Sequence, residues 1–341
     1  MAKRKLSIRQ KNRIQSIQER RRERAISKNS VADEELENLT ELGPEVKGTV
    51  ITNFGAQVDV EGTEGNYKGR IYRCHIRTNL DPLVTGDSVV WRYAEPNGVI
   101  VAREPRSSEL LRPDPYGKLR PVAANIDRIA IVFAPRPTAY SNLIDRYLIA
   151  AEAQGIQPVL VANKIDLLKE ESFSYIEELI GNYRSVGYEV LPVSVKSGEG
   201  LEKLKNYLAD HTSIFVGQSG VGKSSLINQL QPDANMLVGA LSEGKDKGTH
   251  TTTASRLFHL ENGGDLIDSP GIREFAVTNL SEEEIVNGFI EFRPFLGQCK
   301  FRDCKHLTET GCAILQAARE GKILDMRLQN YRNILASQDE K

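Results

Sequence analysis

The segment GQSGVGKSS, residues 217–225, constrains the fold of this 341-residue chain more than any other feature. It fits the pattern G-x-x-x-x-G-K-[ST], follows the apolar run SIFV and precedes the helix-like run LINQL. The glycines let the backbone curl so that successive N–H groups face a phosphate, and the following helix presents its positive N-terminal end. The segment therefore predicts a phosphate-binding loop between a buried strand and a helix. After a proline-containing segment at 112–121, which is expected to be a linker, buried strands such as RIAIVF (residues 128–133) alternate with helical patterns. This alternation predicts a parallel α/β sheet.

The side chains of this loop indicate a nucleoside triphosphate bound with Mg²⁺. Lys223 is expected to reach the β- and γ-phosphates, and the Ser224 hydroxyl to bind the metal ion. The residues predicted to contact the nucleotide here are Gly217, Gln218, Ser219, Gly220, Val221, Gly222, Lys223, Ser224 and Ser225.

Two motifs that could read a guanine base precede the phosphate loop. In NKID, residues 163–166, Asp166 can accept hydrogen bonds from N1–H and from the exocyclic N2 amine of guanine. Asn163 can meet the other edge of the base, and the stem of Lys164 can cover the ring. Adenine has no N2 donor and has an acceptor at N1, so it would leave a buried Asp unpaired. SVK (Ser194, Val195, Lys196) is expected to support the base with a backbone N–H.

Two further segments follow the phosphate loop. KGTHTTT, residues 247–253, offers threonine hydroxyls for the metal ion, and Thr251 is the favoured ligand; a solvated loop is the alternative. GDLIDSPG, residues 264–271, ends a predicted strand. There Asp268 can hold Mg²⁺ through water, and the N–H of Gly271 can meet the γ-phosphate; alone, the motif could also be a simple turn.

The order of these motifs is the usual GTPase series rotated, with its last two elements moved to the front. In a parallel sheet the loops at the carboxyl ends of the strands lie on one edge. Joining the old termini and opening the chain elsewhere preserves that edge if the termini lie close together. We therefore expect an intact guanine-nucleotide site in a circularly permuted domain.

Hydrolysis by this site is expected to be slow without a partner. Many GTPases carry, just after D-x-x-G, a Gln that orients the attacking water, but Ile272 stands here. His250 is the best internal candidate for that task, because an imidazole can orient or accept from water near neutral pH. The alternative is an exposed loop histidine. The predicted catalytic residues are Lys223 and His250.

The N-terminal part divides into an arm and a small barrel. Residues 1–25 carry ten Lys or Arg against two Glu, and an acidic stretch follows, which predicts either a solvated arm or one that engages phosphates. Residues 46–104 then read as five short strands, which suits an OB-fold. Basic residues interleaved with aromatics favour nucleic-acid binding, with an ordinary barrel as the alternative. They are Arg70, Arg73, His75, Arg77, Arg92 and Arg103 among Tyr72, Trp91 and Tyr93.

Three of the four cysteines cluster near the C-terminus. CKFRDCKHLTETGC places Cys299, Cys304, His306 and Cys312 at spacings typical of a closed tetrahedral zinc site. Four protein ligands leave no open position, so one structural Zn²⁺ is expected; three buried thiols and an incidental His are the alternative. Cys74 lies alone and is expected in the barrel core. Nearby basic residues could touch RNA or form a solvated face; they are Lys300, Arg302, Lys305, Arg327 and Arg332.

Together, the barrel, the rotated motif series and the Cys/His cluster resemble the bacterial small-ribosomal-subunit-dependent GTPase family RsgA, also called YjeQ. The resemblance covers the chain from about residue 45. It implies a GTP hydrolase that docks on the small ribosomal subunit, acts late in its maturation, and is slow alone but stimulated by the subunit. A P-loop ATPase or kinase, and an RNA-binding protein with a structural nucleotide site, are the rival interpretations.

The expected architecture is multidomain α/β, and the expected partners are GTP or GDP and the rRNA of the small subunit. The predicted parts are a flexible arm at 1–44, an OB-fold barrel at 45–107, a permuted GTPase domain at 108–276 and a zinc-binding helical domain at 277–341. No apolar run reaches the roughly 18 residues of a membrane span, and no secretory leader is evident. We therefore expect a cytoplasmic monomer.

Overall fold

The computed structural model describes residues 42–77, 80–114, 118–170, 173–231, 255–268 and 280–339. Two compact units contain them. The first holds the residues up to Glu104 apart from Ile51–Asn53 and Val84–Asp87, and the second holds those two segments and Pro105–Lys341. Most of the predicted arm lies outside the described residues, so its behaviour stays a prediction.

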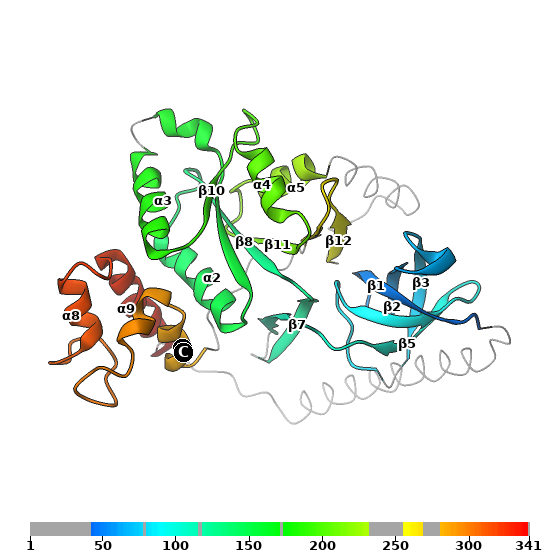
Figure 1. The fold of residues 1–341 in the computed structure, drawn as a ribbon, viewed down its shortest axis with the longest axis horizontal. Coiled ribbons are helices and arrows are strands. Elements are labelled where there is room, and N and C mark those ends of the chain that lie inside the picture. The colour runs from blue at the N-terminus through cyan, green and yellow to red at the C-terminus, as the bar shows by residue number, and fades with distance from the viewer. Residues whose placement is uncertain are drawn as a thin grey trace, which may run out of the picture. The chain divides into compact units, whose positions relative to one another are not determined.

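The first unit is a closed, five-stranded OB-like barrel, as predicted (Figure 1). Its strands are hydrogen-bonded in the order β1-β2-β3-β5-β4, and β4 returns to pair antiparallel with β1. Along β2 the side chains alternate strictly, which buries Val58 and Val60. The elements are β1 (Glu45–Asn53), β2 (Gln57–Gly62), η1 (Gly65–Tyr67), β3 (Ile71–Ile76), β4 (Ser88–Arg92) and β5 (Gly98–Arg103).

Aromatic side chains fill part of the barrel core. Trp91 on β4 is fully buried, and its ring centroid lies 4.9 Å from that of Tyr72 and 5.5 Å from that of Tyr67. Cys74 on β3 is also fully buried, as expected for a lone core thiol. Trp91 therefore belongs to the core and presents no face to an RNA base. For this residue, the alternative of an ordinary barrel with aromatic core residues is the correct one.

The second unit is built on a parallel sheet ordered β10-β9-β8-β11-β13, with β12 antiparallel beside β13. This confirms the predicted alternation of buried strands and helices. The strands are β8 (Arg128–Phe133), β9 (Gln157–Ala162), β10 (Val190–Pro192), β11 (Thr212–Val216), β12 (Arg256–His259) and β13 (Asp265–Asp268). The helices are α2 (Ser141–Ala153), η2 (Ile165–Lys169), α3 (Ser174–Val186), α4 (Leu201–Leu208) and α5 (Lys223–Leu230).

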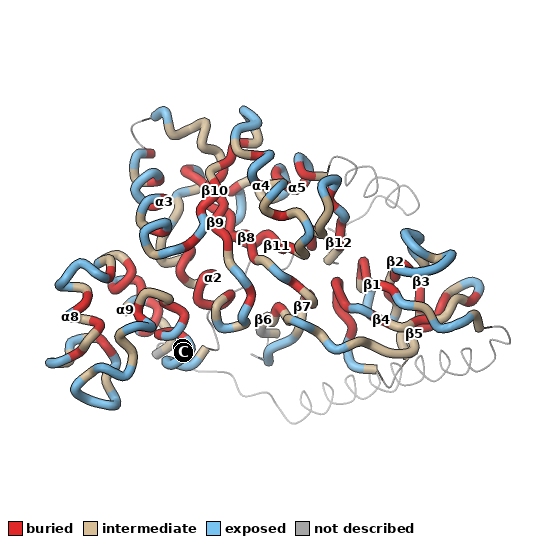
Figure 2. Tube along the Cα trace, viewed as in Figure 1, coloured by how far each residue is buried: buried red, intermediate tan, exposed pale blue. Residues whose placement is uncertain are grey.

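Both faces of this sheet are covered by helices, so its central strands are buried throughout (Figure 2). Ile129 and Ile131 of β8 pack in one apolar cluster with α2 and α3, whereas Ala130 and Val132 pack in a second cluster with α4 and α5. A strand buried on both sides reads as a continuous apolar run, which is why RIAIVF was recognisable in the sequence.

The two ends of the proline-containing segment 112–121, expected to be a linker, instead lie in paired antiparallel strands. Its strands are β6 (Glu109–Pro113) and β7 (Leu119–Ala124), and they form a separate two-stranded sheet. Pro113 is the last residue of β6, and Pro121 pairs with Leu111 where the register shifts. Prolines are tolerated there because edge strands and bulges need fewer backbone donors.

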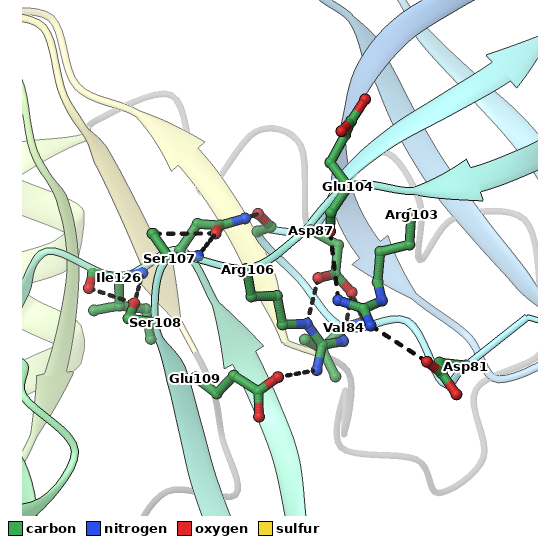
Figure 3. A network of polar contacts seen from close by, with 12 residues as sticks. Asp81, Val84, Asp87, Arg103, Glu104, Arg106, Ser107, Ser108, Glu109 and Ile126 are labelled. Atoms are coloured by element: carbon green, nitrogen blue, oxygen red, sulfur yellow. Dashed lines mark hydrogen bonds and ion pairs between the residues drawn. The ribbon is translucent and has the colours of Figure 1, made fainter.

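A buried ion pair joins the chain segments on either side of β4 and β5. The Arg106 guanidinium donates to both carboxylate oxygens of Asp87, at 2.6 and 2.8 Å, and to Glu109 at 3.0 Å (Figure 3). Asp87 also accepts from the backbone N–H of Val84 at 2.7 Å. Three donors thus meet the oxygens of the fully buried Asp87 side chain, which compensates the cost of burying its charge. The ion pair ties the segment before β4 to the segment after β5.

The C-terminal part of the second unit is helical. Its elements are α7 (Glu282–Asn287), η5 (Ile290–Phe295), α8 (Ala313–Arg319) and α9 (Asp325–Asp339). Ser281 and Glu284 form a capping box at the start of α7. The apolar core of this part includes Phe289, Phe292 and Ile149 of α2. Within the described residues, no helix has the length and apolar character to cross a bilayer.

Candidate nucleotide and metal sites

The predicted phosphate loop runs directly from β11 into α5, which begins at Lys223. Gly217 has a φ of 137°, and a Cβ there would lie 2.2 Å from the carbonyl oxygen of Val132, so only glycine fits against the neighbouring strand. Gly222 has a φ of 98° and forms the N-cap of α5. The loop thus delivers the chain to a helix N-terminus, where the first backbone N–H groups have no intrahelical acceptor and can meet an anion.

The ammonium group of Lys223 lies inside the curve of this loop. Its Nζ donates to the carbonyl oxygens of Gly217 at 2.6 Å and Gln218 at 2.8 Å. Burial raises the pKa of Asp268, at the end of β13, and the charge on Lys223 opposes that rise. The two side chains therefore interact electrostatically, although they are far apart in the sequence. Lys223 was predicted to bind the phosphates and Asp268 to hold Mg²⁺.

The NKID loop and the phosphate loop are in direct contact. Asn163 Nδ2 donates to the carbonyl oxygen of Val221 at 2.9 Å, and Lys164 Nζ donates to that of Gly220 at 2.7 Å. A Cβ on Gly222 would lie 2.4 Å from Asn163 Nδ2, so glycine is required at that position by the neighbouring motif as well as by its backbone angle. The two motifs therefore form one continuous site.

Asp166 is held in place by the SVK segment. The Ser194 hydroxyl donates to Asp166 Oδ1 at 2.6 Å, and Ser194 itself is fully buried. This use of the hydroxyl was missed, because we expected the segment to act through a backbone N–H. Lys164, just before η2, has a φ of 61°, a left-handed conformation that non-glycine residues adopt at some energetic cost and often at functional sites.

The sheet order explains how motifs in rotated order meet. NKID follows β9, SVK follows β10 and the phosphate loop follows β11, and all three strands are parallel members of one sheet. Their carboxyl ends therefore lie at the same edge. Thr251, His250 and Gly271 lie outside the described residues, so their roles stay predictions.

The predicted zinc ligands converge at the other functional site. The Nδ1 atom of His306 lies 3.5 Å from the Sγ atoms of Cys299 and Cys304 and 3.3 Å from that of Cys312. All four ligand atoms lie within 4.8 Å of one another. A tetrahedral Zn²⁺ with ordinary bond lengths needs N···S edges of about 3.6 Å and S···S edges of about 3.8 Å. The Cys299 and Cys312 sulfurs are 3.9 Å apart, so the cluster has the dimensions of such a site.

Backbone geometry supports this cluster. His306 has a φ of 60°, an uncommon conformation for a non-glycine residue, and it turns the chain between two of the thiols. The backbone N–H groups of Ala313 and Leu315 point at the Cys299 and Cys312 sulfurs, at 3.4 and 3.5 Å. Such donors stabilise thiolate ligands, which fits the cluster to a divalent, thiophilic metal ion such as Zn²⁺.

Removal of the metal is expected to destabilise the C-terminal helices. Burial raises the pKa of Cys304 to about 12, so a bound metal ion must displace its proton, and metal affinity should fall as the pH is lowered. We expect one Zn²⁺ per chain by elemental analysis, and loss of both the metal and several degrees of thermal stability in Cys312→Ser. Cys74→Ala, which changes a thiol outside the cluster, should keep the metal. A full metal complement in Cys312→Ser would contradict the ligand assignment.

The basic residues proposed for RNA contact differ in their surroundings. On the barrel, Arg73, Arg92 and Arg103 form ion pairs with Asp59, Glu45 and Asp81. Near the metal cluster, Lys300 and Arg302 are exposed. Arg327, however, is fully buried and contacts protein carboxylates, so both alternatives expected for it, an RNA contact and a place on a solvated face, are wrong. A buried charge cannot be told from a surface charge by residue type alone.

A parallel sheet whose phosphate loop and guanine-reading loop touch, although they occur in rotated order along the chain, is the fold of a circularly permuted P-loop GTPase. The family model described as RsgA GTPase matches residues 103–278, and the chain belongs to this family.

Similar proteins support the same assignment over nearly the whole chain. The small ribosomal subunit biogenesis GTPase RsgA of Ectopseudomonas mendocina is 56% identical over 338 residues, covering 99% of this chain and 98% of that protein. The crystal structure of YjeQ from Thermotoga maritima covers 87% of this chain and 100% of its own, with a TM-score of 0.71 at 30% identity. That of YloQ, a circularly permuted GTPase, covers 89% and 97% with a TM-score of 0.68 at 28% identity.

Proposed function

We propose that this chain binds and hydrolyses GTP in the maturation of the small ribosomal subunit. The observation that carries the proposal is the direct contact between the NKID loop and the phosphate loop, with hydrogen bonds of 2.9 Å from Asn163 and 2.7 Å from Lys164. Such contact supports one site in which the first loop reads the base and the second binds the phosphates of the same nucleotide. The names of relatives above 50% identity, small ribosomal subunit biogenesis GTPases, add the small-subunit context.

Each site residue has a proposed role. Asp166, oriented by Ser194, accepts hydrogen bonds from the guanine edge, and Asn163 meets the other edge of the base. Lys223 neutralises the β- and γ-phosphates, and the exposed Ser224 hydroxyl together with Asp268 would hold Mg²⁺. When bound, Mg²⁺ offsets the charge that develops between the β- and γ-phosphates. Thr251, Gly271 and His250 complete the proposed site, with His250 orienting the water.

The remaining proposals concern partners and organisation. The exposed Arg70, Lys300 and Arg302 are the proposed contacts to rRNA of the small subunit, and the metal is proposed to be one structural Zn²⁺. We propose a monomer that acts in the cytoplasm, with the domain boundaries predicted from the sequence. The described GTPase and metal-binding parts belong to one compact unit, so the last of these boundaries separates parts in close contact.

The test of this function is single-turnover GTP hydrolysis by the purified chain alone, with small ribosomal subunits and with large ones. Because Ile272 lacks a polar group to orient water, hydrolysis by the chain alone should be slow. Small subunits should accelerate it by about tenfold or more, as expected when a partner completes a GTPase site. Equal rates in all three reactions would refute the ribosomal role while leaving GTP binding intact.

A further inference from the structure

A fully buried arginine joins the metal-binding part of the chain to the GTPase domain. Arg327 of α9 donates through Nη1 to Asp145 of α2, and through Nε and Nη2 to both carboxylate oxygens of Glu291 in η5, at 2.6 and 3.0 Å. The side chains of Arg327 and Asp145 have no solvent exposure. Burial opposes the charge on Arg327, yet Asp145 and Glu291 hold its pKa well above the ordinary value.

The carboxylate of Asp145 is the centre of this cluster. It accepts from Asn330 Nδ2 of α9 at 2.6 Å and from the Tyr183 hydroxyl of α3 at 2.6 Å, in addition to Arg327. Burial raises the pKa of Asp145, and Arg327 opposes that rise, so removal of Arg327 would leave a buried acid without its cation. The cluster therefore fixes the relative positions of α9, α2 and α3 more specifically than apolar packing does.

Two of the helices held by this cluster, α2 and α3, each follow a loop of the nucleotide site. The loop between β8 and α2 supplies the carbonyl oxygen of Arg136, which accepts from Lys164 Nζ at 2.8 Å. Tyr175 of α3 donates to the carbonyl oxygen of Pro135 in the same loop at 3.2 Å, and α3 itself follows the NKID loop. A shift of α2 or α3 would consequently move the partners of Lys164.

The other side of α9 is bonded to the metal-binding loop. The Tyr331 hydroxyl donates to the carbonyl oxygen of Lys305, and Arg332 Nη2 donates to that of Leu307, both at 2.8 Å. These carbonyls flank the ligand His306. One helix thus contacts the metal-binding loop through Tyr331 and Arg332, and the GTPase helices through Arg327 and Asn330.

We propose that α9 couples the Cys₃His metal site to the guanine-nucleotide site, with Arg327 as the positioning residue that transmits the coupling. The inference rests on the proposed function only in that the ligand measured is GDP. Because coupling between two binding sites is reciprocal, loss of the metal should weaken GDP binding, and GDP should slow the loss of the metal. The hydrogen bonds of α9 described above form a continuous set of contacts from the metal-binding loop to the helices beside the nucleotide site.

The test is a cycle of four GDP affinities, measured by calorimetry on the full chain with and without its metal, for the wild type and Arg327→Met. Removal of the metal by a chelator should weaken GDP binding roughly 5- to 30-fold in the wild type. Arg327→Met should show a loss of similar size while it retains its metal, and chelation should then add little. Independent, multiplicative losses would overturn the coupling, because a role in general stability alone predicts additive free energies.

The matched control is Arg293→Met. Arg293 of η5 forms an ion pair of 2.6 Å with Glu152 of α2, so it joins the same two parts of the chain, but its side chain is 46% exposed. Exposed ion pairs contribute little to stability. The GDP affinity of Arg293→Met and its response to the chelator should therefore match those of the wild type. An equal loss in Arg293→Met would also contradict a specific role for Arg327.

A second variant covers the case in which Arg327→Met does not fold. Arg327→Lys keeps a buried cation for Asp145 but cannot bridge both carboxylates with a fork of donors. It should fold, retain the metal and show a smaller loss of GDP affinity; wild-type affinity together with wild-type response to the chelator would overturn the proposal. If the wild type itself bound no GDP, the proposed function would fail first, which keeps the two failures distinct.

Discussion

Replacement of Lys223 by alanine is expected to weaken GTP binding by roughly 30-fold to several thousand-fold and to abolish measurable hydrolysis. The Lys223 ammonium lies inside the phosphate loop, 2.6 and 2.8 Å from two loop carbonyls. Truncating one partner of a desolvated charge pair costs about 2–5 kcal/mol, which corresponds to that range of affinities. Displacement of a fluorescent GTP analogue measures the change directly.

The control for this variant is a lysine on the same domain that faces solvent. Lys203 of α4 pairs with Glu189 at 3.1 Å, and its side chain is 65% exposed. Lys203→Ala should bind GTP as the wild type does, because it removes a charge at a surface position only. If Lys223→Ala retained wild-type affinity, the assignment of residues 217–225 to the phosphates would be wrong.

Asp166→Asn is expected to lower GTP affinity by about 100-fold or more and to change which purine is preferred. A carboxylate that accepts from N1–H and from the N2 amine of guanine discriminates strongly, because the wrong base leaves a buried polar group unpaired. An asparagine amide presents a donor in place of one acceptor, which suits the C2 carbonyl of xanthine. Competition among GTP, ATP and xanthosine triphosphate should show a loss for GTP and a gain for the xanthine nucleotide.

Two further variants locate this effect. Ser194→Ala removes the 2.6 Å hydrogen bond that orients Asp166, so it should lower GTP affinity only about fivefold, the effect of one ordinary hydrogen bond. Asp127→Asn changes a carboxylate that accepts from the Thr212 N–H at the start of β11, away from the loop end of that strand, and should leave affinity unchanged. Unaltered base preference in Asp166→Asn would remove the basis for guanine recognition.

The sequence predicted the site best where a residue type at a given position has only one physical explanation. The rotated motif order predicted that NKID and the phosphate loop converge, and the hydrogen bonds of Asn163 and Lys164 to that loop agree with it. Glycines at 217 and 222 are required by positive φ angles and by close neighbours, so their pattern was reliable. The Cys299 to Cys312 spacing was equally specific, because few other arrangements bring three thiols to one imidazole.

The misses share a physical cause. Arg327 was expected to touch RNA or to lie on a solvated face, because a charged residue on a helix usually faces water. Its burial depends on Asp145, which is distant in sequence. Segment 112–121 was expected to be a linker because prolines disfavour a central strand, whereas Pro113 ends a strand and Pro121 lies at a register shift of a two-stranded sheet. In both cases the structure depends on pairing with another segment of the chain, and the residues of the segment alone do not reveal that pairing.

The most direct test of the account is a crystal structure of this chain with bound GDP. We expect the guanine edge to lie within hydrogen-bonding distance of the Asp166 carboxylate, and the phosphates to lie against the backbone N–H groups at residues 220–224. One nucleotide would then span two motifs whose order along the chain is the reverse of the usual one. A nucleotide whose base lies away from residues 163–166, or that binds elsewhere on the molecule, would contradict the central claim.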